Sequence, residues 1–192
     1  MKKLILILPV LTGIMWGSVG TFVRKLTEAG ADTFTILAIR TLIAALLLMG
    51  ILLITNKDLL KIKIKDAWIF AACGLLGTFS LNVCYTEAIN HLSLSLAAVL
   101  LSLSPVYVVI IAGLFLKEKF TSRKVLCMIL ALIGCALVSG LFESGGFSWS
   151  LSGIIFGILA GFFCGLYSVF SKVATDRGYD PVTITFYSMI FA

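Results

Sequence analysis

Residues 92–116 read LSLSLAAVLLSLSPVYVVIIAGLFL and contain no charged side chain. A helix needs about 20 predominantly apolar residues to cross a hydrocarbon core of about 30 Å. Inside the bilayer each backbone polar group must find a partner within the protein, which favours a helix over an open strand. This stretch therefore predicts a transmembrane helix.

Similar apolar stretches lie on both sides of it. They cover residues 4–23, 34–54, 67–89, 125–141, 147–171 and 181–192. The composition agrees, because 60% of the 192 residues are hydrophobic and only 12% are charged, whereas a soluble domain has about 25% charged residues. We predict an all-α membrane protein, a polytopic helical bundle whose main partner is the lipid bilayer.

Positive charges are distributed unevenly between the connections. Of the 15 Lys and Arg residues, Arg24 and Lys25 lie on one side of the predicted membrane and Arg40 lies within a span. All the others lie on the opposite side, which includes the N-terminus. Because cytoplasmic loops carry an excess of Lys and Arg, we predict a multi-pass protein of the plasma (inner) membrane with a cytoplasmic N-terminus.

The sequence also resembles itself at an offset of 148 residues. The alignment is ungapped over the first span, its loop and the start of the second span. It pairs Gly13 with Gly161, Gly17 with Gly165, Thr27 with Thr175, Gly30 with Gly178 and Asp32 with Asp180. The loop identities favour a true repeat, since loops share no hydropathy pattern that would produce them.

This offset makes the sixth span a repeat of the first, so one unit has five spans. Five crossings are an odd number, so the second unit enters the membrane from the opposite face, as in the inverted repeats of many secondary transporters. We expect residues 1–142 to form a five-helix unit and residues 143–192 to begin an inverted second unit that is truncated. The intact protein would have roughly 300 residues and ten spans.

Polar residues within the spans are the candidates for a solute pathway, because each is costly in lipid unless it has a partner. Thr78, Asn82 and Tyr85 share one helical face, which either lines a polar cavity or hydrogen-bonds to another helix. Arg40 either offers a positive charge to an anionic group or extends toward the interface. Glu87 either pairs with Arg40, carries a proton or is merely interfacial.

Three further residues extend this candidate pathway. Pro105 interrupts the helical bonding of the fourth span and either kinks it or exposes carbonyls to a cavity, with Ser102 on the same stripe. Trp16 either contacts the solute or is an interfacial or space-filling aromatic residue. Small residues on the first and sixth spans predict close helix packing, at Gly13, Gly17, Gly153, Gly157, Gly161 and Gly165.

Several function classes find little support. The five cysteines lie in apolar runs without CxxC spacing, and His91 is the single histidine, so we predict no metal site and no cofactor. There is no GxxxxGK[ST] loop for ATP and no basic face for nucleic acid. An enzyme would need clustered acid–base groups, and the spans carry only Arg40 and Glu87 as charged residues.

Motifs in the third to fifth spans resemble the EamA-type transporters of the drug/metabolite transporter superfamily. They are YTEAINHLSLSLAAVL (85–100), LSPVY (103–107), FLKEKFT (115–121) and GCALV (134–138), together with Trp16-Gly17 and Arg40. The resemblance implies a ten-helix carrier made of two five-helix units around a central cavity. It also implies a solute such as an amino acid, a metabolite, a drug or a nucleotide sugar.

We therefore expect a secondary transporter of small organic solutes that works by alternating access. The alternative is a non-transporting membrane scaffold or a channel subunit. Glu87 is a candidate proton carrier, so coupling of transport to protons is one alternative. The sequence predicts neither the solute, nor the direction of transport, nor the oligomeric state.

Overall fold

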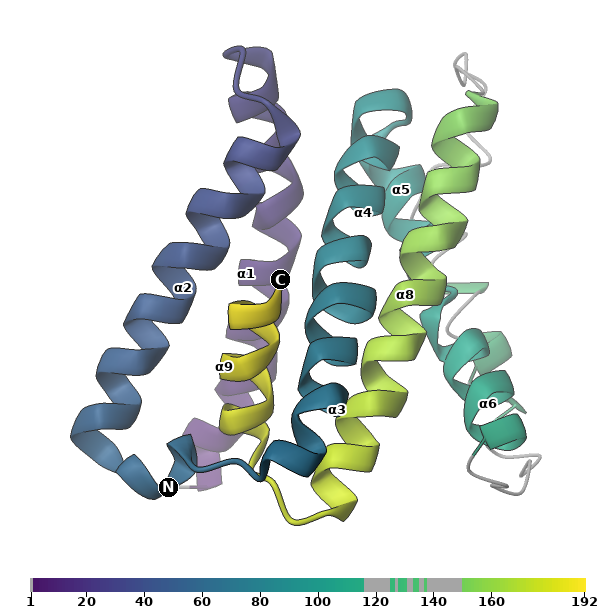
Figure 1. Ribbon diagram of the computed structural model, residues 1–192. Coiled ribbons are helices and arrows are strands. Elements are labelled where there is room, and N and C mark those ends of the chain that lie inside the picture. The colour runs from purple at the N-terminus through teal and green to yellow at the C-terminus, as the bar shows by residue number, and fades with distance from the viewer. Residues whose placement is uncertain (1, 116–124, 127, 131–132, 135–136, 138–149) are drawn as a thin grey trace.

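The computed structural model describes residues 2–115, 125–126, 128–130, 133–134, 137 and 150–192 (Figure 1). The elements of this part are all helical. In chain order they are α1 (Lys2–Glu28), α2 (Thr33–Thr55), η1 (Lys57–Leu60), η2 (Ile64–Asp66), α3 (Ala67–Ala71), η3 (Ala72–Phe79), α4 (Ser80–His91), α5 (Leu94–Leu101), α6 (Ser104–Phe115), α8 (Leu151–Asp176) and α9 (Pro181–Phe191). The predicted all-α class is confirmed for these residues.

Within the described residues, four helical stretches are long and apolar enough to cross a membrane. They are Thr33–Thr55, Ile64–His91, Leu94–Gly113 and Leu151–Asp176. The predicted first span lies within α1. The predicted fifth span, residues 125–141, falls largely outside the described part of the chain.

Two helical hairpins have the same turn. Between α1 and α2, Gly30 takes a left-handed φ of 89° and the Asp32 carboxylate caps the next helix by accepting from Phe34 N at 3.1 Å. Between α8 and α9, Gly178 has a φ of 88° and Asp180 accepts from Val182 N at 2.8 Å. Glycine adopts this backbone conformation without the steric cost that a Cβ would add.

The predicted third span is one continuous column of α3, η3 and α4 (Figure 1). Its centre, η3, is a π-helix, in which each turn is wider than in an α-helix. Two hydroxyl groups bond carbonyls five residues back along this segment. Thr78 donates to Cys73 O at 3.3 Å, and Ser80 donates to Leu75 O at 2.9 Å.

The predicted fourth span is broken rather than continuous. α5 ends at Leu101 and α6 begins at Ser104, so the stretch Leu94–Gly113 is interrupted just before Pro105. Proline has no N–H to bond the preceding turn, and its ring crowds the carbonyl four residues earlier. The expected interruption is therefore a full break between two shorter helices.

α8 lies between α4 and α6, and its glycines allow this close approach (Figure 1). A Cβ added at Gly157 would lie 2.5 Å from Leu100 Cδ1, and one added at Gly165 would lie 2.8 Å from Tyr107 Cβ. At Gly161 the added atom would meet the carbonyl oxygen of Leu100 at 2.9 Å. The small residues of α8 thus face the break between α5 and α6.

The other three glycines predicted to pack closely, Gly153, Gly13 and Gly17, have different surroundings. Gly153 faces His91 and Leu92 at the end of α4, with an added Cβ 2.6 Å from Leu92 Cγ. Gly13 and Gly17 on α1 have no atom of the described residues within 4 Å of an added Cβ.

Candidate functional site

A charged group within the bundle joins α2 to α4. The Arg40 guanidinium, on α2, donates from Nη2 to the Asn82 side-chain oxygen. Asn82 in turn donates from Nδ2 to Thr78 O at 2.6 Å. Arg40, Asn82 and the backbone carbonyl of Thr78 form a short chain of polar groups within apolar helical segments, and Arg40 and Asn82 are both only partly exposed.

This chain of groups follows from the spacing of residues on the third span. Thr78 and Asn82 are four residues apart, so the Asn82 amide reaches Thr78 O one turn earlier. Asn82 points toward Arg40 of α2, whereas the Thr78 hydroxyl donates to Cys73 O within the third span. Tyr85 lies on another side, because its ring packs against the buried cluster formed by Ala88, Ile89 and Ala97. The predicted polar face therefore divides between two neighbours.

Glu87 has partners of its own nearer the end of α4. Its Oε1 accepts from the Thr33 hydroxyl at 3.1 Å, and its Oε2 lies 3.8 Å from His91 Nε2. The structure brings Arg40 to Asn82 rather than to Glu87. Glu87 consequently connects the start of α2 with the end of α4.

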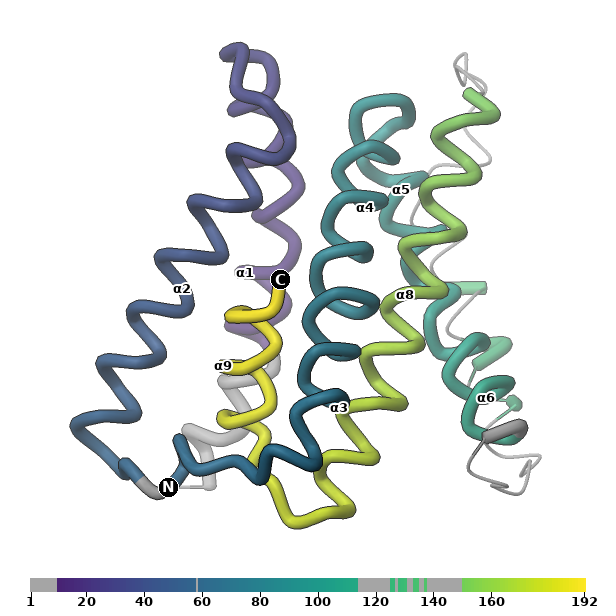
Figure 2. Tube along the Cα trace, in the orientation of Figure 1, coloured from purple at the N-terminus to yellow at the C-terminus, as the bar shows by residue number. Residues whose placement is uncertain are grey.

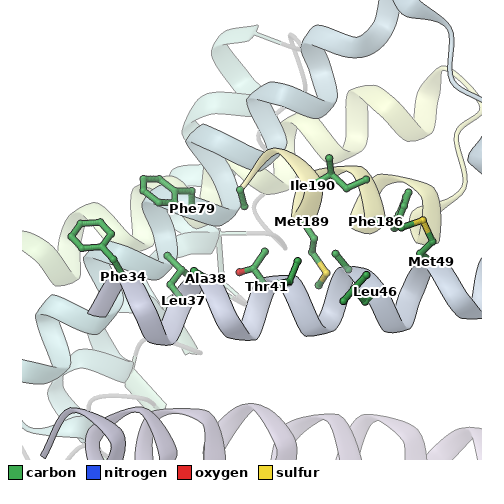
Figure 3. Close-up of a pocket in the computed structure, with 13 residues that line it drawn as sticks. Phe34, Leu37, Ala38, Thr41, Leu46, Met49, Phe79, Phe186, Met189 and Ile190 are labelled. Atoms are coloured by element: carbon green, nitrogen blue, oxygen red, sulfur yellow. The ribbon is translucent and has the colours of Figure 1, made fainter. Parts of the chain in front are cut away.

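An apolar cavity of about 530 Å³ lies between α2 and α9 (Figure 3). Thr41 supplies the one polar side chain among the residues that line it. Those residues are Phe34, Leu37, Ala38, Thr41, Leu42, Ala45, Leu46, Met49, Phe79, Phe186, Met189, Ile190 and Ala192. A volume of this size falls within the range of small-molecule pockets, about 300–1,000 Å³.

The cavity and the polar groups share two helical elements. Thr41 in the cavity wall directly follows Arg40, and Phe79 directly follows Thr78. In Figure 3, Met189 of α9 extends toward the side of α2 that carries Thr41 and Leu46. Arg40 itself is not among the lining residues, because successive residues of a helix point in different directions.

Other predicted pathway residues lie away from this cavity. Trp16 is 65% exposed on α1. Ser102 donates to Ala98 O at 2.8 Å at the end of α5, and Pro105 lies at the start of α6. These three residues are not among those that line the cavity.

Sequence reasoning missed the aromatic and sulfur-containing side chains of the cavity wall. Phe79, Phe186 and Met189 stand in largely apolar stretches, although Thr78, Thr185 and Ser188 directly precede them. No pattern distinguishes a cavity-lining Phe from a lipid-facing one in such a run. Only the approach of α9 to α2 reveals them.

Comparison with known proteins identifies the family of this chain. A model of the EamA-like transporter family matches residues 3–140. The chain belongs to the EamA-like transporter family. The predicted family is thereby confirmed, and with it the class of membrane proteins named for transport.

Individual relatives of this EamA-like chain cover nearly all of it. It is 27% identical over 99% of its length to an uncharacterized transporter of Archaeoglobus fulgidus. It is 28% identical over 89% of its length to the uncharacterized transporter YdfC of Bacillus subtilis. It is 28% identical over 92% of its length to the uncharacterized inner membrane transporter YhbE of Escherichia coli.

The EamA-like chain is shorter than these relatives. It spans 64% of the Archaeoglobus protein, 55% of YdfC and 56% of YhbE. No solved structure matches the chain.

Proposed function

We propose that this EamA-like chain is the first five-helix unit, residues 1–142, and the beginning of an inverted second unit, residues 143–192, of a secondary transporter. The transporter moves small organic solutes across the plasma membrane by alternating access. Family membership and the relatives named as transporters support this proposal. They also favour a transporter over a membrane enzyme.

The two hairpins support the inverted repeat. Gly30 and Asp32 of the first hairpin have counterparts in Gly178 and Asp180 at the 148-residue offset, with the same turn and the same cap. α1 and α8 run in opposite directions through the bundle, as Figure 2 shows. Equivalent segments of opposite direction are what an odd-numbered repeat produces.

Arg40 carries the functional proposal. A cation within a membrane helix is costly, up to about 2.5–3.5 kcal/mol at the helix centre on insertion scales, so such residues are generally functional. Arg40 directly precedes Thr41, which lines the cavity, and its guanidinium is held by a neutral partner, Asn82, on α4. We propose that its guanidinium attracts the anionic or strongly polar end of a solute whose apolar part occupies the cavity.

The remaining predicted pathway residues keep their proposed roles. Tyr85, Ser102, Pro105 and Trp16 would contribute to the pathway in other conformations of the carrier. Glu87 is the proposed site of any proton coupling, through its contacts with Thr33 and His91.

The Lys and Arg distribution supports a cytoplasmic N-terminus, and the name of the inner-membrane relative YhbE supports the plasma membrane.

Solute flux in proteoliposomes tests the proposal. The protein is reconstituted in the longest form that its gene encodes and is supplied with a panel of labelled amino acids, carboxylates and neutral drugs. We expect flux of at least one solute, and a loss of roughly ten-fold or more for Arg40→Gln, since a charge-assisted hydrogen bond is removed.

Lys25→Gln is the matched control, because it removes a cation from the exposed end of α1. Normal flux in Arg40→Gln would remove Arg40 from the pathway. The absence of flux across the whole panel would favour the scaffold or channel-subunit alternative.

A further inference from the structure

A cluster of polar groups joins the segment before α3 to the turn between α8 and α9. Asp66 stands at its centre and is only 8% exposed. The Arg177 guanidinium donates from Nη1 to Asp66 Oδ1, and the Tyr179 hydroxyl donates to Oδ2 at 2.7 Å. Residues more than a hundred positions apart in the sequence therefore share one carboxylate.

Additional contacts surround this carboxylate. Lys63 N donates to the Tyr179 hydroxyl at 3.2 Å, and the Arg177 guanidinium carbon lies 5.8 Å from the centre of the Trp68 ring. Partial burial raises the pKa of the Tyr179 phenol, so this hydroxyl keeps its proton at neutral pH and remains a donor to Asp66. We call Asp66, Arg177 and Tyr179 the latch.

α9 is tied to the same segment by two more hydrogen bonds. Thr183 donates to Leu59 O at 2.8 Å, and Tyr187 donates to Leu60 O at 2.7 Å. Both carbonyls belong to η1, at the lower end of the bundle in Figure 1. The connection between α2 and α3 is thus bound to α9 as well as to the turn before it.

An apolar layer lies directly inside the latch. Ile69, Phe70 and Cys73 of the third span pack against Ala174 and Ile184, and all five are essentially unexposed. The Phe70 ring meets the rings of Tyr179 and Tyr187, with centroid distances of 5.0 and 5.4 Å. We call these five residues the plug.

We propose that the latch and the plug form a closed gate between the first unit and the start of the second, and that solute passage requires Asp66 to release Arg177 and Tyr179. This inference rests on the proposed transport function. α9 belongs to both the gate and the cavity, because Ile184 is in the plug while Phe186, Met189 and Ile190 line the cavity. Asp66, Arg177 and Tyr179 are positioning residues, since they act by holding α9 and the α8–α9 turn in place.

The latch and the plug have the two properties that a gate needs, which are a water-excluding contact and a bond that can be released. The plug excludes water while it is closed, and the apolar contacts that make up most of it are not directional. Charge-assisted hydrogen bonds at the rim are directional and stronger than neutral ones. Water reaches the rim more easily than the plug, so the latch is the part of the contact that opens first.

The native thiol of Cys73 reports the state of the gate. The protein retains Cys73 while the other four cysteines, at positions 84, 127, 135 and 164, are replaced by Ala. A water-soluble maleimide is applied to membrane vesicles on the side that carries η1 and η2. In the parent protein we expect slow labelling, because Cys73 is 0% exposed.

We expect Asp66→Asn and Arg177→Gln to raise the labelling rate of Cys73 roughly ten-fold or more, because each removes a charge-assisted hydrogen bond from the closed state. Tyr179→Phe should raise it less, since Arg177 still holds the carboxylate. Asp176→Asn is the matched control, because it removes an exposed carboxylate next to Arg177. Unchanged labelling in the Asp66 and Arg177 variants, or an equal rise in the control, would overturn the inference.

A second reporter separates gating from unfolding. Cys84 on α4 is 8% exposed and lies outside the plug. In a background that retains only Cys84, its labelling rate should not respond to Asp66→Asn. A parallel rise at Cys73 and Cys84 would indicate general loosening and would also contradict a gate.

Cross-linking connects the gate to transport. In the double variant Asp66→Cys with Arg177→Cys, a short thiol cross-linker that is cleavable by reductant should abolish flux, and the reductant should restore it. Flux that continues through the cross-linked protein would overturn the gate. If the parent protein moves no solute, the transport proposal fails, while the Cys73 labelling still decides whether the latch holds this contact closed.

Discussion

Arg40 and Asn82 show how one neutral side chain keeps a cation inside an apolar bundle. Asn82 accepts from Arg40 with its oxygen and satisfies its own amide through Thr78 O at 2.6 Å. Within the described residues, no buried side-chain nitrogen or oxygen lacks a hydrogen-bond partner. Each buried polar side-chain atom in the described part of the spans is therefore matched, although the surrounding sequence is almost entirely apolar.

Removing one partner of the Arg40–Asn82 pair should lower the free energy of unfolding more than removing both. Asn82→Leu leaves the guanidinium without its acceptor and should lower the free energy of unfolding by about 1.5–3 kcal/mol. The double variant Arg40→Met with Asn82→Leu should recover much of that loss, because neither polar group then remains. Thermal unfolding of the purified protein in detergent measures both, and additive losses would contradict the pairing.

Arg24, near the end of α1, binds the C-terminal end of α4, which its position in the sequence does not predict. Its Nη2 donates to Ile89 O at 3.0 Å and to Leu92 O at 2.8 Å, so it binds the carbonyls that α4 leaves open at its C-terminus. Arg24→Gln should destabilise the protein by about 1.5–3 kcal/mol.

Lys25 provides the comparison for Arg24, because it is adjacent, cationic and exposed. Lys25→Gln should change stability by less than about 0.5 kcal/mol, as is usual for surface positions. Unfolding midpoints of the two variants in the same detergent settle the point. Equal shifts would mean that the charge, and not the carbonyl contacts, determines the effect.

At the scale of elements, the glycines of α8 explain how that helix approaches the break between α5 and α6. A Cβ at Gly161 would lie 2.9 Å from Leu100 O, which is a backbone atom and cannot rotate away. Gly161→Ala should therefore destabilise the protein by about 1–3 kcal/mol, despite the better helix propensity of alanine.

Gly13 is the control for this substitution, since it is the residue that precedes Gly161 by 148 positions. No atom of the described residues lies within 4 Å of a Cβ added there. Gly13→Ala should be neutral or stabilising by up to about 1 kcal/mol. Unfolding midpoints compare the pair, and the reverse order would contradict the packing of α8.

Most helices were predictable because hydropathy and length are sufficient to find a membrane span. The π-helical centre of the third span was not, since Ala72–Phe79 has no residue that marks a wide turn. The break before Pro105 was foreseen only as an interruption, because proline removes one bond and does not determine how far the next helix turns.

At the scale of the whole molecule, the candidate site depends on contacts between segments far apart in the chain. Arg40, Asn82 and Thr78 were recognisable as polar residues in apolar spans, so sequence analysis named them. The cavity wall and the latch were not recognisable. Asp66, Arg177 and Tyr179 stand near other charged and polar loop residues, and only the folded chain brings them to one point.

The inverted repeat makes a prediction that opposite faces of the membrane can test. Glu28 and Asp176 are exposed, lie at the ends of α1 and α8, and are separated by 148 residues. In a protein without other cysteines, Glu28→Cys should react with an impermeant maleimide added to intact cells. Asp176→Cys should react only in inside-out vesicles.

Each of these variants is the control for the other, because both replace an acidic residue at the same helical position. Labelling of the two positions from the same face would contradict the inverted arrangement. Labelling of both from the faces opposite to those expected would preserve the inversion but place the N-terminus outside the cytoplasm.

α9 is one continuous helix with Ile184 in the plug and Phe186, Met189 and Ile190 in the cavity wall. Any solute that binds the cavity more tightly in one position of α9 must therefore favour that position over the other. Reciprocity of coupled equilibria then requires that the state of the latch change solute affinity by the same factor. In such a carrier, variants that weaken the latch are also affinity variants, although no latch residue touches the cavity.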